Sequence, residues 1–289
     1  MALSPSTRKT LLRMQKSEIT EHCIYRSIAK RTKDSHNKEV IESIAKEEKD
    51  HYDTWAGYTG VRMRPNHLKV ILFRLMNVLF GITFVLKYME RGEMFAQKTY
   101  RDIKEEVPEA ERIEKEENEH EMALLGTLDE NRVKYIRSTV LGLNDALVEL
   151  TGALAGLTFA LSDNTLISLS GLITGIAASL SMAASEYLST KAEGRSDALR
   201  SSLYTGTAYV LVVALLIAPY LLLDNAFISL AIMLVTALLI ILVFNFYMAV
   251  ALDLNFKQRF LQMVTISMGV AGFSFLVGIA LRSLFGIDI

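Results

Sequence analysis

Two short stretches of the chain carry a glutamate and a histidine three residues apart. They read Glu48-Lys-Asp-His51 and Glu117-Asn-Glu-His120. Residues at this spacing share one face of a helix, so each pair can reach the same metal ion. Carboxylate oxygen beside imidazole nitrogen suits iron or manganese, with zinc as an open alternative. One such motif in a glutamate-rich run is usually a solvated helix face, but two of them favour a metal centre.

Four helices are expected to position these residues, over about 5–32, 36–56, 65–105 and 108–129. Ser4-Pro5 is a helix start, Gly57 and Gly60 are stops, and Pro108 opens the last helix. Short connections between four helices favour an up-and-down bundle.

The other two helices of this bundle also carry acidic residues that could bind metal. The first offers Glu18 and Glu21, and the third offers Glu90 and Glu93. Glutamates from two helices with Glu-x-x-His from the other two form the di-iron carboxylate arrangement. The expected ligands are Glu18, Glu48, His51, Glu90, Glu93, Glu117 and His120.

The second half of the chain has a different composition. Of the 63 charged residues, 48 lie in the first 137 positions. Apolar runs of membrane-spanning length follow at about 138–161, 166–188, 203–223, 226–251 and 262–285. The sequence therefore predicts an all-α protein with a bundle domain over 1–132 and a five-span membrane domain over 133–289.

Basic residues predict the orientation of these spans. The ends before the first span, between the second and third, and between the fourth and fifth carry Arg132, Lys134, Arg137, Lys191, Arg195, Arg200, Lys257 and Arg259. The opposite ends of the spans carry only Arg282. The positive-inside rule then places the N-terminus in the cytoplasm and the C-terminus outside. The apolar stretch 70–89 is interrupted by Arg74 and Lys87, so it is interpreted as an amphipathic helix that packs in the bundle, on a partner subunit or on the membrane surface.

The first and second spans carry acidic residues at membrane depth. Asp145 lies about 12 Å along its helix from Arg137, and Met182 about 13–14 Å from Lys191. Carboxylates inside a membrane are costly and mark functional sites by default. We therefore expect a cation site built from Asp145, Met182, Glu149, Asn144 and Glu186, the alternative being carboxylates held by structural hydrogen bonds.

The first half resembles the rubrerythrin branch of the ferritin-like family over about residues 5–130. Glu18 with Tyr25 seven residues later, Glu90-x-x-Glu93 and the two Glu-x-x-His motifs carry the resemblance. It implies a di-iron centre, with manganese or zinc as alternatives, and Tyr25 and Glu21 beside the ligands. The given sequence contains no Cys-x-x-Cys pairs like those of the rubredoxin segment of rubrerythrin, so the resemblance does not extend to an electron supply for peroxide reduction.

The second half resembles the vacuolar iron transporter family through GLNDALVELTGALAG and SMAASEYLS. The resemblance covers about 135–289 and implies a homodimer that moves Fe²⁺ or Mn²⁺ out of the cytosol in exchange for protons, with Asp145 and Met182 at the transport site. Ala146 stands where the family often has glycine. The connector 188–202 is too short for the metal-binding insertion of eukaryotic members, a role that the N-terminal bundle could take.

The whole chain thus resembles the membrane-bound ferritins of prokaryotes, which implies a plasma-membrane location. We expect a metal exporter with a metal-capturing bundle and no nucleic-acid partner. The alternatives are a membrane-anchored ferroxidase or peroxide scavenger, and a metal sensor that gates a channel.

Overall fold

The computed structural model describes residues 3–93, 100, 103–126 and 130–285. For 90–93, 121, 125–126, 130–138, 141 and 285 it describes the backbone alone. The described residues are almost all helical and include no strand. They divide into two compact units, Met1–Asp129 and Glu130–Ile289.

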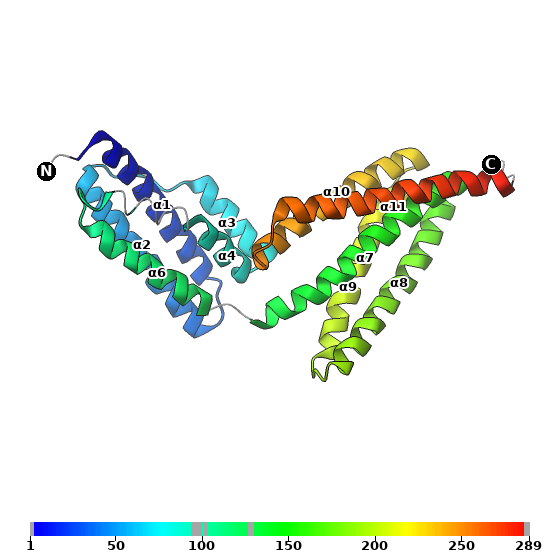
Figure 1. Ribbon diagram of the computed structural model, residues 1–289, viewed down its shortest axis with the longest axis horizontal. Coiled ribbons are helices and arrows are strands. Elements are labelled where there is room, and N and C mark those ends of the chain that lie inside the picture. The colour runs from blue at the N-terminus through cyan, green and yellow to red at the C-terminus, as the bar shows by residue number, and fades with distance from the viewer. Residues whose placement is uncertain (1–2, 94–99, 101–102, 127–129, 286–289) are drawn as a thin grey trace. The chain divides into compact units, whose positions relative to one another are not determined.

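The first unit contains α1 (Pro5–Ala29), α2 (Ser35–Thr59), α3 (His67–Phe80), α4 (Ile82–Glu93) and α6 (Glu109–Gly126). The Ser4 hydroxyl accepts from the Thr7 amide at the start of α1, as expected for an N-cap. Asp34 caps α2 in the same way, and α2 ends at Gly60, whose φ is +68°. α2 packs against both α1 and α6 (Figure 1).

The single helix expected over 65–105 is instead interrupted at Gly81. Its φ of +84° and ψ of 171° end α3, and α4 begins at the next residue. Glycine adopts a positive φ without steric cost because it has no Cβ. The apolar stretch 70–89 is therefore two short helices, and α3 packs on α1.

One apolar cluster of the first unit gathers around Trp55. Trp55 is fully buried with Leu11, Met14, Tyr100 and Ile113. These residues come from α1, α2, α6 and the segment before α6, so one apolar cluster joins elements that are distant in sequence.

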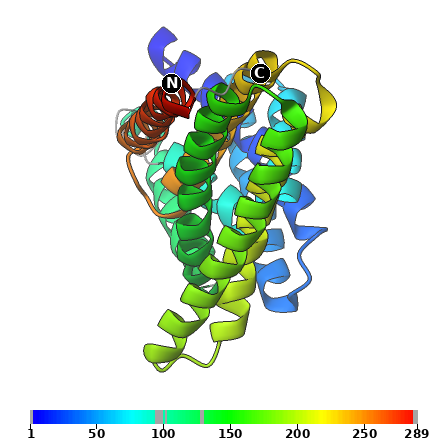
Figure 2. The same cartoon turned by 90° about the vertical axis from the view of Figure 1, so that its right-hand side faces the viewer.

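The second unit contains α7 (Glu130–Leu161), α8 (Asn164–Ala192), α9 (Ala198–Leu222), α10 (Ala226–Ala251) and α11 (Phe256–Phe285). Four of these, α8 to α11, are long and apolar enough to cross a membrane. α7 is longer still, but Asn144, Asp145 and Glu149 reduce its apolar character. α7, α8 and α9 pack side by side (Figure 2).

Glycines bring these helices close together. A Cβ at Gly278 of α11 would lie 2.5 Å from the carbonyl oxygen of Gly156 in α7. A Cβ at Gly175 of α8 would lie 2.6 Å from Val213 of α9. Such contacts between small residues and neighbouring helices are typical of membrane helix packing.

Candidate metal centre and membrane carboxylates

Three helices of the first unit bring four acidic and imidazole side chains to one point. Glu18 comes from α1, Glu48 and His51 from α2, and Glu117 from α6. One ligand atom from each lies within 4.8 Å of those of the other three. Glu18, Glu48 and His51 are at most 2% exposed. Buried carboxylates are costly unless they are paired, protonated or bound to a metal, so this cluster is a candidate metal centre.

The two histidines are held by carboxylates of the opposite helix. Nε2 of His120 in α6 lies 2.9 Å from Oε2 of Glu47 in α2. Nε2 of His51 in α2 lies 2.9 Å from Oε2 of Glu116 in α6. The rings stack with their centroids 5.7 Å apart. These crossed pairs turn Nδ1 of each histidine towards the buried carboxylates.

The inner nitrogens lie close to the buried acids. Nδ1 of His51 is 3.1 Å from Oε1 of Glu117. Nδ1 of His120 is 3.5 Å from Oε1 of Glu48 and 3.7 Å from Oε2 of Glu117, which is long for a hydrogen bond. This nitrogen is fully buried and makes no hydrogen bond within the described residues. A buried nitrogen facing two carboxylates without a good hydrogen bond fits a metal ligand.

The cluster strongly changes the proton affinities of its members. Burial raises the pKa of Glu117, but the close imidazoles of His120 and His51 outweigh it and hold that pKa at about 2. Burial lowers the pKa of His120, but Glu117 and Glu47 outweigh it and raise that pKa to about 9. In the metal-free protein at neutral pH, His120 is therefore a cation beside an ionised Glu117.

The pKa of Glu18 is shifted in the opposite direction from that of Glu117. Burial, followed by the charges of Glu48 and Glu117, raises its pKa well above the usual range. Trp55 Nε1 donates to Oε1 of Glu18 at 3.1 Å, and the Tyr100 hydroxyl donates to the same oxygen at 3.4 Å. A divalent ion would remove the repulsion between these carboxylates, so the donor set of three glutamates and two histidines fits iron or manganese.

The other residues predicted for this site lie as follows. Tyr25 is fully buried in α1. Glu21 accepts from Lys69 of α3 at 3.3 Å and from Ser17 at 2.9 Å. Glu90 and Glu93 lie in the last turns of α4, and their side chains are outside the described part of the structure.

Sequence reasoning missed Glu47 and Glu116. Each directly precedes the glutamate of its motif, so both motifs read Lys-Glu-Glu-x-x-His. The repetition of the extra glutamate in both motifs could have indicated these two residues from the sequence. A histidine that binds metal through one ring nitrogen usually donates from the other to a carboxylate or carbonyl.

In the second unit, Asp145 and Glu149 lie one turn apart on α7. The hydroxyl of Tyr209 in α9 donates to Oε2 of Glu149 at 2.7 Å. Tyr209 is fully buried, whereas both carboxylate residues are exposed within the single chain. Tyr209 was not predicted, because one tyrosine in an apolar span has no distinctive spacing.

The remaining residues predicted for the membrane site lie on α7 and α8. Met182 is partly buried and packs against the apolar core of the unit. Glu186 accepts through Oε1 from Ser201 of α9 at 2.5 Å and from Thr190 at 3.2 Å. Asn144 is partly buried beside Asp145. Glu186 is thus held by hydroxyl donors near the α8–α9 connection.

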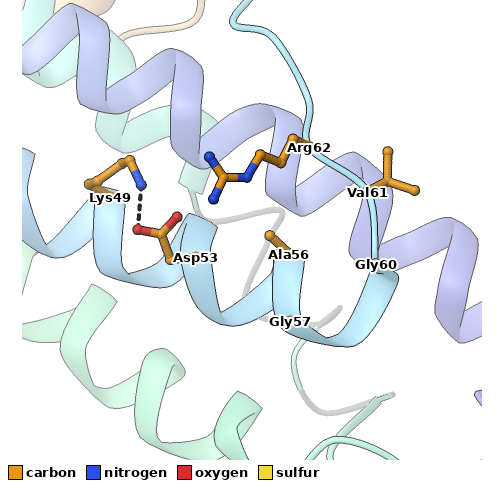
Figure 3. A pocket seen from close by; sticks show the side chains of 7 residues that line it. All are labelled: Lys49, Asp53, Ala56, Gly57, Gly60, Val61 and Arg62. Carbon is orange, nitrogen blue, oxygen red and sulfur yellow. Dashed lines mark hydrogen bonds and ion pairs between the residues drawn. The ribbon is translucent and has the colours of Figure 1, made fainter.

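A surface hollow lies along the C-terminal half of α2 (Figure 3). It is lined by Lys49, Asp53, Ala56, Gly57, Gly60, Val61 and Arg62. Lys49 and Asp53 form an ion pair within it. The hollow has two basic groups and one acidic group and contains none of the buried ligands.

Comparison with known proteins supports the membrane assignment. Residues 136–198 match the model of the VIT family. The matched segment includes Asp145, Glu149, Met182 and Glu186. Comparison with curated proteins gives no match. The match covers residues 136–198 alone, and together with the four apolar helices it supports a membrane protein.

Proposed function

We propose that the protein exports Fe²⁺ or Mn²⁺ from the cytosol in exchange for protons, with the N-terminal bundle capturing the metal. One observation carries the proposal: a single chain combines a buried glutamate–histidine cluster with a segment matching the VIT family. Two parts of the chain, each suited to divalent cations, then serve one process.

The membrane carboxylates supply the coupling. A carboxylate binds a divalent ion only when it is deprotonated, so metal and protons compete for Asp145 and Glu149. Protonation from outside would release the metal, and loss of those protons to the cytosol would restore the site. In this proposal α7 is a fifth span, two chains form a homodimer, and the N-terminus is cytoplasmic as the basic connectors favour.

The bundle is proposed to be a ferritin-like di-metal domain. Glu18, Glu48, His51, Glu117 and His120 would hold the ions, and Glu90 and Glu93 would complete the ligand set from α4. A bound iron pair would supply redox chemistry there. The residues of the chain keep water out, orient the imidazoles and accept or release the protons that metal binding displaces.

Flux through the purified full-length chain in proteoliposomes tests the exporter. Fe²⁺ and Mn²⁺ uptake and internal pH are followed together under an imposed pH gradient. Asp145→Asn keeps the size but removes the charge, so metal flux and coupled proton movement should both fall steeply. Asp224→Asn, an exposed site in the α9–α10 connection, is the matched control and should behave like the parent. Parent-like, pH-dependent flux in Asp145→Asn would refute the transport site.

A membrane-anchored ferroxidase or peroxide scavenger is the second candidate. Complete burial of Glu48 and His51 favours it, because a resident metal suits a closed site better than one in transit. The same vesicles separate the two functions. An anchored enzyme gives no flux in the parent protein, yet the iron-loaded chain consumes oxygen or peroxide.

A further inference from the structure

The most exposed apolar surface of the first unit is one face of α3. Six aliphatic side chains there are each more than half exposed, namely Leu68, Ile71, Leu72, Leu75, Val78 and Leu79. Their spacing of three and four residues places them on a single side of the helix. Soluble surfaces rarely gather so many large apolar side chains without a partner.

The orientation of this face is fixed by the opposite side of α3. Val70, Phe73 and Met76 are buried there. Lys69 Nζ donates to Glu21 of α1 at 3.3 Å, and Arg74 Nε donates to Ser27 of α1 at 3.0 Å. The six aliphatic residues therefore cannot turn inward without breaking this packing and both polar contacts.

The charge of the surrounding segment indicates what covers the face. Residues 54–89 contain five basic residues, Arg62, Arg64, Lys69, Arg74 and Lys87, and no aspartate or glutamate. This is unusual in a chain with a net charge of −1. Basic groups beside an apolar helix face are typical of helices that lie in the interface of an anionic membrane.

A second copy of the chain fits this face less well. A symmetric dimer through α3 would bring the same basic segment against itself, because a two-fold interface pairs a patch with its own copy. The face also lacks the tyrosine, tryptophan and arginine anchors that dominate the energetics of protein interfaces. A lipid surface needs only apolar area and opposite charge.

We propose that α3 is a membrane-docking helix, which inserts its six aliphatic residues among the acyl chains of an anionic leaflet. Arg62 and Arg64, exposed just before the helix, lie beside the phosphates of the head groups. The chain is already embedded in a membrane, so this docking requires no separate recruitment. It does not depend on transport, and it would hold even if the membrane unit carried no metal.

Spin labelling of the full-length chain tests this docking. Cys23, the single cysteine in the sequence, is first replaced by serine. Leu72→Cys on the face and Glu39→Cys on the exposed side of α2 then each receive a nitroxide label. The chains are placed in nanodiscs of phosphatidylcholine alone or mixed with phosphatidylglycerol. Collisions with lipid-soluble oxygen and with a water-soluble nickel chelate are then measured.

The label at 72 should show a several-fold loss of nickel collisions and a gain of oxygen collisions when phosphatidylglycerol is present. The label at 39 should stay open to nickel in both discs. Adding Arg62→Gln with Arg64→Gln, or raising the salt concentration, should partly restore nickel access at 72. Adding Ile71→Gln with Leu75→Gln should restore it further.

Two results would overturn the proposal. Equal nickel access at 72 and 39 in phosphatidylglycerol discs would show that α3 faces water. Protection at 72 accompanied by spin–spin broadening, which disappears when labelled chains are diluted with unlabelled ones, would show that a second copy covers the face.

Discussion

Glu47 and Glu116 each fix the orientation of a histidine on the opposite helix through one carboxylate oxygen. Replacing both glutamates by alanine removes these acceptors, so we expect metal affinity to fall about 10- to 100-fold. Glu47→Gln with Glu116→Gln keeps an acceptor oxygen and should lose less. Chelator competition measures the affinity, in an Asp145→Asn background that silences the membrane site.

Glu119→Ala is the control for this experiment. Glu119 lies on α6 between Glu116 and His120 and is exposed. Its removal changes the charge by the same amount as Glu116→Ala alone, without touching an imidazole. Equal loss of affinity in Glu119→Ala and Glu116→Ala would mean that net charge, rather than orientation of the ring, controls binding.

The titration of His120 predicts how metal binding depends on pH. Because the pKa of His120 in the metal-free protein is about 9, this ring is protonated at pH 7 and must lose its proton to bind metal. Affinity should rise between pH 7 and 9, and the contribution of His120 to this rise should level off above about pH 9. Calorimetry in two buffers of different ionisation enthalpy should show proton release at pH 7 that diminishes towards pH 10. Proton release that is the same at both pH values would contradict the assignment.

The pKa shifts of His120 and Glu117 also make the stability of the metal-free bundle depend on pH. Metal affinity should rise between pH 7 and about 9, whereas this stability should fall. The pKa of His120 is raised, so its protonated form stabilises the fold. This contribution is complete below about pH 6.5, the ordinary pKa of histidine, and is lost as the pH rises through about 9. A lowered glutamate pKa stabilises the fold above its ordinary value, and that contribution is lost as pH falls towards about 2. The metal-free bundle should therefore become less stable under alkaline conditions.

The sequence predicted Glu48, His51, Glu117 and His120 as ligands because helical spacing alone places each pair on one face. It did not identify Glu47, which neighbours a ligand and therefore points about 100° around the helix from it. Only the packing of α2 against α6 shows that this direction reaches His120. Tyr209 was also not predicted, because its contact with Glu149 depends on how α7 and α9 cross.

At the scale of elements, the approach of α11 to α7 depends on Gly278. Gly278→Ala would put a Cβ 2.5 Å from the backbone oxygen of Gly156, which can relieve the clash only if a helix moves. Overpacking of this kind costs about 1–3 kcal/mol. Gly272→Ala on the same helix meets nothing within 4 Å. It should be neutral or slightly stabilising, because alanine favours helix by up to about 1 kcal/mol.

Thermal unfolding of both glycine variants in the same detergent measures the difference. A melting temperature that falls for Gly278→Ala and not for Gly272→Ala supports the close contact. Equal melting temperatures would show that α11 can shift away from α7 without loss.

Helix ends were predicted well where a side chain or a proline specifies them. Ser4 caps α1, α6 starts directly after Pro108, and α10 spans the predicted 226–251. The interruption at Gly81 was missed because a glycine within an apolar helical pattern is usually tolerated. Nothing local to 78–84 shows that the backbone there takes a positive φ.

At the scale of the whole molecule, the basic connectors predict which ends of the membrane helices are cytoplasmic. In a Cys23→Ser background, Asp224→Cys should react with a membrane-impermeant thiol reagent on intact cells, and Ser196→Cys should react only after lysis. Both positions are exposed, whereas Asn164, the first residue of α8, donates to the backbone of Leu223 and is a poorer probe. The reverse labelling pattern would invert the proposed direction of transport.

The division into a charged half and an apolar half was readable from composition, because burial in a membrane excludes charge over long stretches. The all-helical architecture followed from the same patterns. The number of spans does not follow from composition in the same way. α7 is long enough to cross a membrane, but it carries polar residues, and whether a membrane helix can carry them depends on how its neighbours pack against it.

The crossed pairs of Glu47 with His120 and Glu116 with His51 give the centre an approximate two-fold axis that passes between the stacked rings. Two ions held there would have nearly interchangeable surroundings on the α2 and α6 sides. Among the described residues, the departure from equivalence comes from Glu18 of α1, one oxygen of which accepts from both Trp55 and Tyr100. If a pair of ions binds there, spectroscopy should therefore show similar surroundings from α2 and α6, with the indole and phenol holding a single carboxylate on the α1 side.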